Sequence, residues 1–163
     1  MSAVALAREA SLEQLRVQRE RLLAVIAALS GDELASQPVV GDWSVRDILA
    51  HILSWEEEAA KRLKLIAKGQ PEKIEWVAPG KVDEWNAKAR EKKSRMLPGE
   101  VLTKLAARRQ ELSRLLERLP QEALADGSRT PLSVWFPNCT HKHEEEHAQQ
   151  IEAWRQELET SET

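Results

Sequence analysis

Apolar residues recur every three or four positions along most of this chain, and strict alternation of apolar and polar residues is scarce. This spacing predicts amphipathic helices rather than strands. Leucine, alanine, glutamate, arginine and lysine dominate the sequence, and all five favour helix. The pattern predicts an all-α fold, with helices over residues 11–29, 44–67, 82–95, 98–119 and 138–158.

Capping residues and helix breakers mark the expected boundaries. Ser44 is a good N-cap for the second helix, and Asp47 stands at its N3 position, as in a capping box. Pro98 either interrupts the third helical region or starts a new helix. The segments 69–82 and 126–137 are rich in turn-forming residues, and we expect loops there.

Four long amphipathic helices with one longer middle connection predict a four-helix bundle. The alternative is another small all-α arrangement. A chain of 163 residues suits one domain with one core, and we expect that domain over residues 1–163, with the bundle at about 8–158.

Composition argues against several classes of partner. The net charge is −3, which gives no electrostatic reason to expect nucleic acid or an anionic membrane surface. No apolar run approaches the roughly 20 residues that span a bilayer. The N-terminus lacks the pattern of a signal peptide. The single cysteine, Cys139, excludes an intrachain disulfide and fits a reducing cytoplasm, so we expect a cytoplasmic protein.

Three histidines are the main candidates for chemistry. His143 and His147 are four residues apart and fall on the apolar stripe of the last helix, together with Ile151. His51 lies at the edge of the apolar stripe of the second helix. In a simple up-down-up-down bundle these two helices run parallel, and the three imidazoles would lie at the same end. The alternative is that they are packed or solvated side chains with no ligand.

Three neutral imidazoles with an open coordination position describe a catalytic metal site better than a structural one. Such a metal can lower the pKa of a bound water to about 7, bind a thiolate or polarise a carbonyl. Glu146 and Glu58 lie near the edges of the histidine faces and are weak candidates for a general base or a supporting partner. Exposed charge is the alternative interpretation of both residues.

A di-iron carboxylate centre fits the sequence less well. Such bundles need the Glu-x-x-His motif on two helices. Glu144 and His147 supply it once, but Ile48 occupies the matching position before His51.

Three further residues are candidates for a substrate pocket. Trp55 follows His51 by one turn, and Trp85 and Asn86 open the third helical region. Ordinary core or surface positions are the alternative. Cys139 precedes the last helix, but no base is identified near it, and we interpret it as a structural thiol.

Two blocks resemble a known family. Residues 42–55 (DWSVRDILAHILSW) resemble the second-helix signature of the DinB-like superfamily, particularly its ClbS/DfsB-type branch. Residues 138–147 (NCTHKHEEEH), with the residues that follow, resemble its fourth-helix signature. The ClbS/DfsB-type branch often lacks the full histidine pair on the last helix. This chain has both histidines, which favours a metal-bearing member over that branch's toxin-hydrolase role.

The resemblance implies an up-down-down-up bundle with a long connection between helices two and three. It also implies a divalent metal, often zinc, nickel or iron, held at His51, His143 and His147. Members are often homodimers, and their activities include hydrolysis, isomerisation and transfer that depends on a low-molecular-weight thiol.

We therefore expect a metal-dependent enzyme, a hydrolase or a thiol S-transferase, that acts on a small molecule. One alternative is a non-catalytic bundle that sequesters a metal or a small toxin. Another is a structural or DNA-damage-associated interaction protein, although no basic stripe supports contact with DNA.

Overall fold

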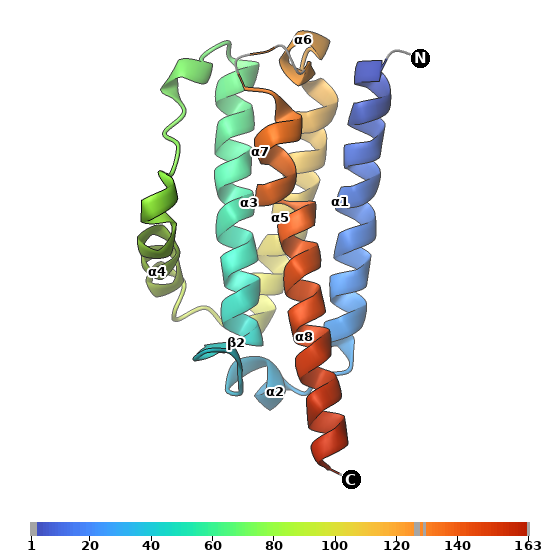
Figure 1. Cartoon of the computed structure of the whole chain (residues 1–163), viewed down its shortest axis with the longest axis vertical. Helices are drawn as coiled ribbons and strands as arrows, with labels where there is room; N and C mark the ends of the chain where they lie inside the picture. The colour runs from blue at the N-terminus through green and yellow to red at the C-terminus, as the bar shows by residue number, and fades with distance from the viewer. Residues whose placement is uncertain (1–2, 126–127, 129, 163) are drawn as a thin grey trace.

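Four long helices form a bundle in the computed structural model of the chain, which describes residues 3–125, 128 and 130–162 (Figure 1). These helices are α1 (Ala3–Ala27), α3 (Val45–Ala67), α5 (Pro98–Arg118) and α8 (His141–Ser161). In Figure 1, α1 and α8 run downward whereas α3 and α5 run upward. The predicted four-helix bundle is confirmed. Its direction is up-down-down-up, so α3 and α8 are antiparallel and not parallel as in a simple up-down-up-down bundle.

The start of α3 is fixed by the predicted capping box. The Ser44 hydroxyl accepts a hydrogen bond from the backbone N–H of Asp47 at 3.2 Å, and the Asp47 carboxylate accepts one from the Ser44 N–H at 3.1 Å. These two bonds satisfy backbone donors that the first turn of a helix leaves without partners. They also set the first residue of α3, and with it the position of His51 about two turns later.

A short helix and a hairpin precede α3, and the sequence pattern did not predict them. They are α2 (Gly31–Ala35), β1 (Pro38–Val40) and β2 (Trp43–Ser44). The strands pair antiparallel with Val40 opposite Trp43, and Gly41 takes a φ of 58° in the turn, where glycine has no steric penalty. The hairpin holds Trp43 against the first turns of α3.

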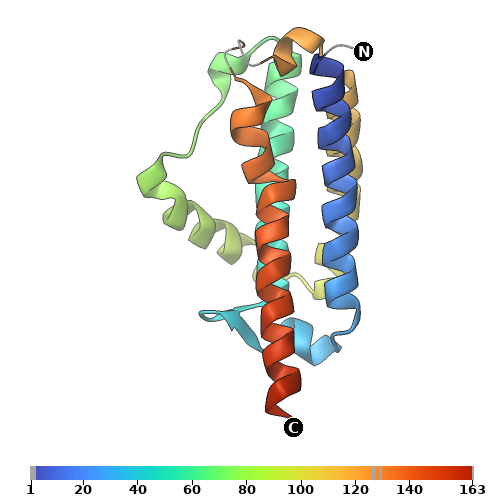
Figure 2. The ribbon, with the colours of Figure 1, turned by 45° about the vertical axis from the view of Figure 1, so that its right-hand side comes forward.

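The long connection between α3 and α5 runs back down the outside of the bundle (Figure 2). It contains the short helices η1 (Pro71–Lys73) and η2 (Pro79–Lys81) and the helix α4 (Val82–Lys92), which packs on α3. The predicted helix over residues 82–95 is three residues shorter in the structure. Pro98 starts a new helix, where its missing N–H costs no hydrogen bond.

The loop predicted over residues 126–137 is partly helical. After α6 (Gln121–Leu124), the helix α7 (Leu132–Cys139) leads into α8. Residues 126, 127 and 129 lie outside the described part of the chain. The prediction was wrong for α7 because Pro131 and Pro137 suggested a break. Pro131 instead serves as the N-cap, and the buried face of α7 keeps helical spacing through Leu132, Trp135, Phe136 and Cys139.

The core consists of two apolar clusters with a layer of charge between them. One cluster includes Leu15, Leu63, Leu112, Leu116 and Phe136. The other includes Leu22, Ile48, Leu49, Leu105 and Ile151. The layer between them, which we call the ion quartet, has one residue from each long helix: Arg19, Glu56, Arg109 and Glu144.

Each charge of the ion quartet has partners. Arg19 contacts Glu56 at 2.7 Å and Glu144 at 2.6 Å, and Arg109 contacts both carboxylates as well. The guanidinium groups also donate to backbone carbonyls, Arg19 to Leu105 at 3.0 Å and Arg109 to Leu15 at 2.8 Å. Both carboxylates are completely buried. Two positive and two negative charges balance, which is the condition for keeping ions in a dry interior.

Candidate metal centre

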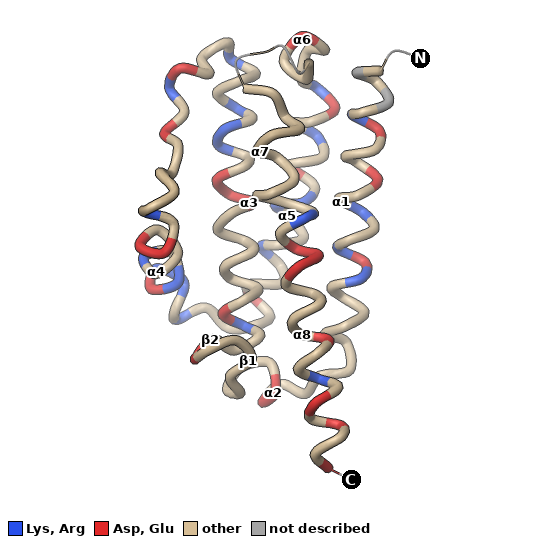
Figure 3. The backbone as a smooth tube through the Cα atoms, viewed as in Figure 1, with Lys and Arg blue, Asp and Glu red and all other residues tan. Residues whose placement is uncertain are grey.

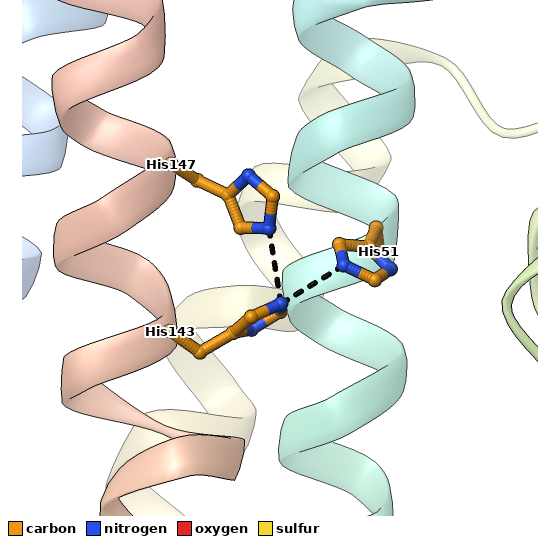
Figure 4. A group of neighbouring side chains, drawn as sticks. All are labelled: His51, His143 and His147. Atoms are coloured by element: carbon orange, nitrogen blue, oxygen red, sulfur yellow. Dashed lines mark hydrogen bonds between the residues drawn. The ribbon is translucent and has the colours of Figure 1, made fainter. Parts of the chain in front are cut away.

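Three imidazole rings from two helices converge on one point (Figure 4). His51 comes from α3, and His143 and His147 come from adjacent turns of α8. Nε2 of His143 lies 2.9 Å from Nε2 of His51 and 3.0 Å from Nε2 of His147. One nitrogen from each residue lies within 4.8 Å of the others, so the cluster has the ligands and the size to hold a metal ion.

The antiparallel helices can meet here because α7 precedes α8. His51 is in the second turn of α3, which begins at the lower end of the bundle in Figure 1, whereas α8 begins part of the way down, where α7 ends. His143 and His147 therefore reach the depth of His51 although both are in the first turns of α8. The three imidazoles therefore meet in an antiparallel pair of helices, and a parallel pair is not required.

Burial keeps the three imidazoles neutral. His51 is 8% exposed, and burial lowers its pKa to about 4, with a smaller contribution from His147. Burial lowers the pKa of His143 to about 2, and the neighbouring imidazoles lower it further. The pKa of His147 is also lowered by burial. Neutral imidazole is the form that binds metals, so protons compete weakly for this cluster near pH 7.

Hydrogen bonding alone does not satisfy the cluster. Nε2 of His143 has a single site in the plane of its ring, occupied by either a proton or a lone pair. It can make one good hydrogen bond there, yet it has neighbours at 2.9 and 3.0 Å. Three lone pairs directed at a shared cation would remove the conflict, because each imidazole would then act as a ligand and no Nε2 atom would need to donate.

The other ring nitrogens differ in their partners. Nδ1 of His147 lies 2.8 Å from Oε1 of Gln150. In His51 and His143, Nδ1 is buried without a hydrogen-bond partner among the described residues. His147 is thus the member of the cluster whose orientation is supported by a side-chain amide.

Tryptophans surround the cluster. The ring of Trp43 meets His51 edge-on at 5.2 Å, and Trp55 lies 6.4 Å from His143. The indole N–H of Trp55 donates to Oδ1 of Asn86 at 3.0 Å, and Trp85 stacks on Trp55 at 4.2 Å. These contacts join α3 to α4, so the outer helix covers one side of the site.

A pocket of about 300 Å³ opens onto the cluster. It shares its wall with a more polar pocket of about 780 Å³ that continues along α4. The smaller pocket is lined by Val40, Gly41, Asp42, Trp43, Ile48, His51, Asn86, His147 and Gln150.

The candidate pocket residues occupy different places. Asn86 lines the pocket beside His51 and His147. Trp55 lies behind Asn86 as its hydrogen-bond partner, and Trp85 lines a separate pocket of about 390 Å³.

The two glutamates considered as bases lie away from the pocket. Glu58 accepts a hydrogen bond from Arg62 at 3.3 Å and lines the separate pocket with Trp85. Glu146 is exposed on α8. Among the described residues that line the pocket of about 300 Å³, the acidic one is Asp42. It forms an ion pair with Arg90 at 3.2 Å.

Neighbouring residues of α8 and α7 have structural surroundings. His141 is half-buried beside Phe136, with ring centroids 6.4 Å apart. Burial raises the pKa of the Cys139 thiol, which fits a structural thiol. Glu144 belongs to the ion quartet, so it is not available as the carboxylate ligand of a di-iron motif.

Sequence reasoning missed Trp43 and Gln150 as parts of the site. Trp43 directly precedes the N-cap Ser44, and the sequence has no clear signal for the hairpin that turns its side chain toward His51. Gln150 had a usable signal, because it follows His147 by three residues and lies on the same face of α8.

The bundle and the three-histidine cluster define a helical protein with a candidate metal site. The family model of the DinB superfamily matches residues 14–151, and the chain belongs to this superfamily. No curated protein and no solved structure gives a significant match. None of the described helices combines the length and the apolar character that crossing a membrane requires.

Proposed function

We propose that this protein is a metal-dependent enzyme in which His51, His143 and His147 hold one divalent transition-metal ion, with zinc, nickel and iron as the candidates. The observation that carries the proposal is the approach of two neutral Nε2 atoms, those of His51 and His147, to within 2.9 and 3.0 Å of Nε2 of His143, beside an open pocket. A closed structural site would have a fourth protein ligand.

When bound, the ion would supply Lewis-acid chemistry, which polarises a carbonyl or lowers the pKa of water or of a thiol. The residues of the chain bind the ion and orient the substrate. His51 and His147 line the pocket and direct their Nε2 atoms toward His143, and Trp43 covers His51 from the hairpin side.

The substrate we propose is a small molecule that reacts by hydrolysis or by thiol-dependent transfer. A pocket of about 300 Å³ takes a compact reacting group, and the adjoining pocket of about 780 Å³ has room for a low-molecular-weight thiol or for the rest of the substrate. A nucleic acid is not proposed as a partner, because positive and negative residues are interspersed along the helices (Figure 3).

Elemental analysis of protein purified without a metal-affinity tag tests the site. Wild type should carry about one transition-metal ion per chain, and His143→Ala should carry none, since three-histidine sites depend on each ligand. The matched control is His141→Ala, which removes a histidine of the same helix that lies outside the cluster. If the wild-type protein takes up none of zinc, nickel, iron or manganese, the proposal of a metal centre is wrong.

The second candidate is a non-catalytic bundle that binds a metal or a small toxin. One observation favours it: among the described residues that line the pocket, Asp42 is the sole carboxylate, and Arg90 engages it. Turnover separates the two functions. A binder captures ligand in proportion to protein and releases no product, whereas an enzyme converts many equivalents.

A second copy of the chain is the macromolecular partner we propose. An apolar groove of about 520 Å³ runs between α1 and α5, with Leu15 and Leu105 in its floor, and Leu23 beside it is 45% exposed. Light scattering should report a homodimer, and Leu23→Glu should shift it to monomer. Val134→Glu on α7, where Val134 is 66% exposed, is the control and should leave the dimer intact.

A further inference from the structure

The hydrogen bond between Trp55 and Asn86 fixes which way the Asn86 amide faces. The indole N–H of Trp55 lies 3.0 Å from Oδ1 of Asn86. An indole N–H can only donate, so the amide oxygen must be the atom that faces it. The usual ambiguity between the oxygen and nitrogen of an asparagine is thereby resolved by chemistry.

The amide nitrogen of Asn86 is then left for other partners. It carries two N–H donors, and it has no hydrogen-bond partner within the part of the chain that the structure describes. Asn86 lines the pocket of about 300 Å³ together with His51 and His147. A donor without an acceptor among the described residues therefore stands in the pocket wall beside His51 and His147.

Trp55 is itself held in place, which makes the orientation of Asn86 rigid. Trp85 stacks on its ring at 4.2 Å, and His143 meets it edge-on at 6.4 Å. Asn86 and Trp85 are consecutive residues of α4, so the stacked pair and the hydrogen bond act on the same turn of that helix. Little side-chain entropy is lost when an amide held in this way binds a ligand.

Gln150 repeats the arrangement on the opposite helix. Its Oε1 lies 2.8 Å from Nδ1 of His147. When Nε2 of His147 points at a metal, Nδ1 carries the proton and donates it, so the amide nitrogen of Gln150 also remains free to donate. The pocket wall thus has two amide donors, and its carboxylate, Asp42, is engaged by Arg90.

We propose that Asn86 is a substrate-binding residue whose amide N–H groups donate to an oxygen of the ligand, and that Trp55 is the positioning residue that aims this amide. The ligand class is a small molecule with a carbonyl or carboxylate group next to the reacting centre. This inference rests on the proposed metal-dependent function, because the ligand must reach the three histidines and Asn86 together.

Acetate is a suitable probe, since one of its oxygens can occupy an open metal position while the other accepts a hydrogen bond. The protein is loaded with Co²⁺, and the dissociation constant of acetate is measured from the visible absorption bands. Imidazole serves as the second probe, because it binds metals without offering an oxygen acceptor. The variants are Asn86→Leu and Trp55→Phe, and the matched control is Asn138→Leu, an exposed asparagine on α7.

In Asn86→Leu, acetate should bind about tenfold more weakly, which is the size of effect expected for losing a hydrogen bond to a charged group. Trp55→Phe retains the Asn86 amide but frees it to turn, so the dissociation constant of acetate should rise by a smaller factor. The dissociation constant of imidazole should stay unchanged in both variants, and Asn138→Leu should match wild type with both probes. If Asn86 had a purely structural role, Asn86→Leu would weaken the binding of acetate and of imidazole equally.

Two results separate this inference from the proposed function. If the wild-type protein binds one Co²⁺ but acetate binds equally well, or not at all, in wild type and Asn86→Leu, the role of Asn86 is overturned and the metal centre stands. If the wild-type protein retains no Co²⁺, the proposed metal centre fails and the inference fails with it.

Discussion

His147 and Gln150 form a hydrogen bond within one turn of α8, with Nδ1 of the imidazole 2.8 Å from Oε1 of the amide. An amide oxygen can only accept, so the proton must reside on Nδ1. The lone pair of His147 is then on Nε2, the atom that faces His143 at 3.0 Å. Gln150 therefore selects the tautomer in which His147 can bind a metal.

Replacing Gln150 by leucine should weaken metal binding without removing any ligand. Loss of the partner that orients a metal-binding imidazole typically lowers affinity by about 10–100-fold. Competition of Zn²⁺ between the protein and a chromophoric chelator measures this change. Gln149→Leu alters an exposed neighbour and should behave as wild type. Equal affinities in the two variants would show that His147 needs no support.

The stability of the metal-free protein should fall as the pH drops below about 6.5. The folded pKa values of His51 and His143 are about 4 and about 2, and both are below the 6.5 of an exposed imidazole. Between these values the unfolded chain binds more protons than the folded one. Each histidine therefore contributes a loss of up to about 1.4 kcal/mol per pH unit in the free energy of unfolding.

Urea unfolding at half-unit steps from pH 7.5 to about 4.5, with a chelator present, measures this dependence. His51→Gln removes one of the two groups and should flatten the curve below about pH 6.5. Carboxylates titrate in both proteins, so the difference between the two curves isolates the histidine. Parallel curves would mean that His51 takes up protons equally in the folded and unfolded states.

Removing one residue of the ion quartet should lower the stability of the protein strongly. Arg109→Met leaves the buried carboxylates of Glu56 and Glu144 with one guanidinium between them, and such a change costs about 3–5 kcal/mol. Chemical denaturation measures the loss. Arg114→Met, an exposed arginine of the same helix, is the control and should have little effect.

Adding a second substitution should recover part of that stability. In the double variant Arg109→Met with Glu56→Gln, one positive and one negative charge are both gone, so the interior is neutral again. The double variant should be more stable than the sum of the two single effects predicts, by about 1–3 kcal/mol. Simple additivity would indicate that the two side chains do not interact as the structure indicates.

Removing the N-cap of α3 should cost a moderate amount of stability. Ser44→Ala deletes the acceptor for the Asp47 N–H, and loss of such a cap costs about 1 kcal/mol. Thermal unfolding checks the change, with Ser94→Ala at an exposed position as the control. An unchanged midpoint for Ser44→Ala would show that backbone contacts hold the start of the helix.

The start of α3 and the bundle itself could be predicted because their causes are local. The Ser44 cap depends on residues within three positions of one another, and the apolar stripes depend on helical spacing. The convergence of His51 with His143 and His147 required more, because the relative direction of α3 and α8 depends on the path of the connection between residues 68 and 97. The family resemblance supplied the correct direction, whereas the simple topology did not.

The remaining features depend on contacts between distant segments. The helix α7 forms around Trp135 and Phe136 because its apolar face is buried against the bundle, although Pro137 lies within it. The ion quartet joins residues 35 to 125 positions apart. Its one visible trace in the sequence is a charged residue in the middle of an apolar stripe, as with Arg19 between Leu15 and Leu22.

The ion quartet also determines how far along its axis each helix can slide. Apolar side chains tolerate a shift of one turn, about 5.4 Å, because one leucine can replace another. A charged residue does not, since the same shift would leave a buried carboxylate opposite aliphatic groups. Glu144 is the residue after His143, so the vertical alignment that pairs Glu144 with Arg19 and Arg109 also brings His143 level with His51. The buried charges of the ion quartet therefore set the axial alignment of the helices that carry the imidazoles.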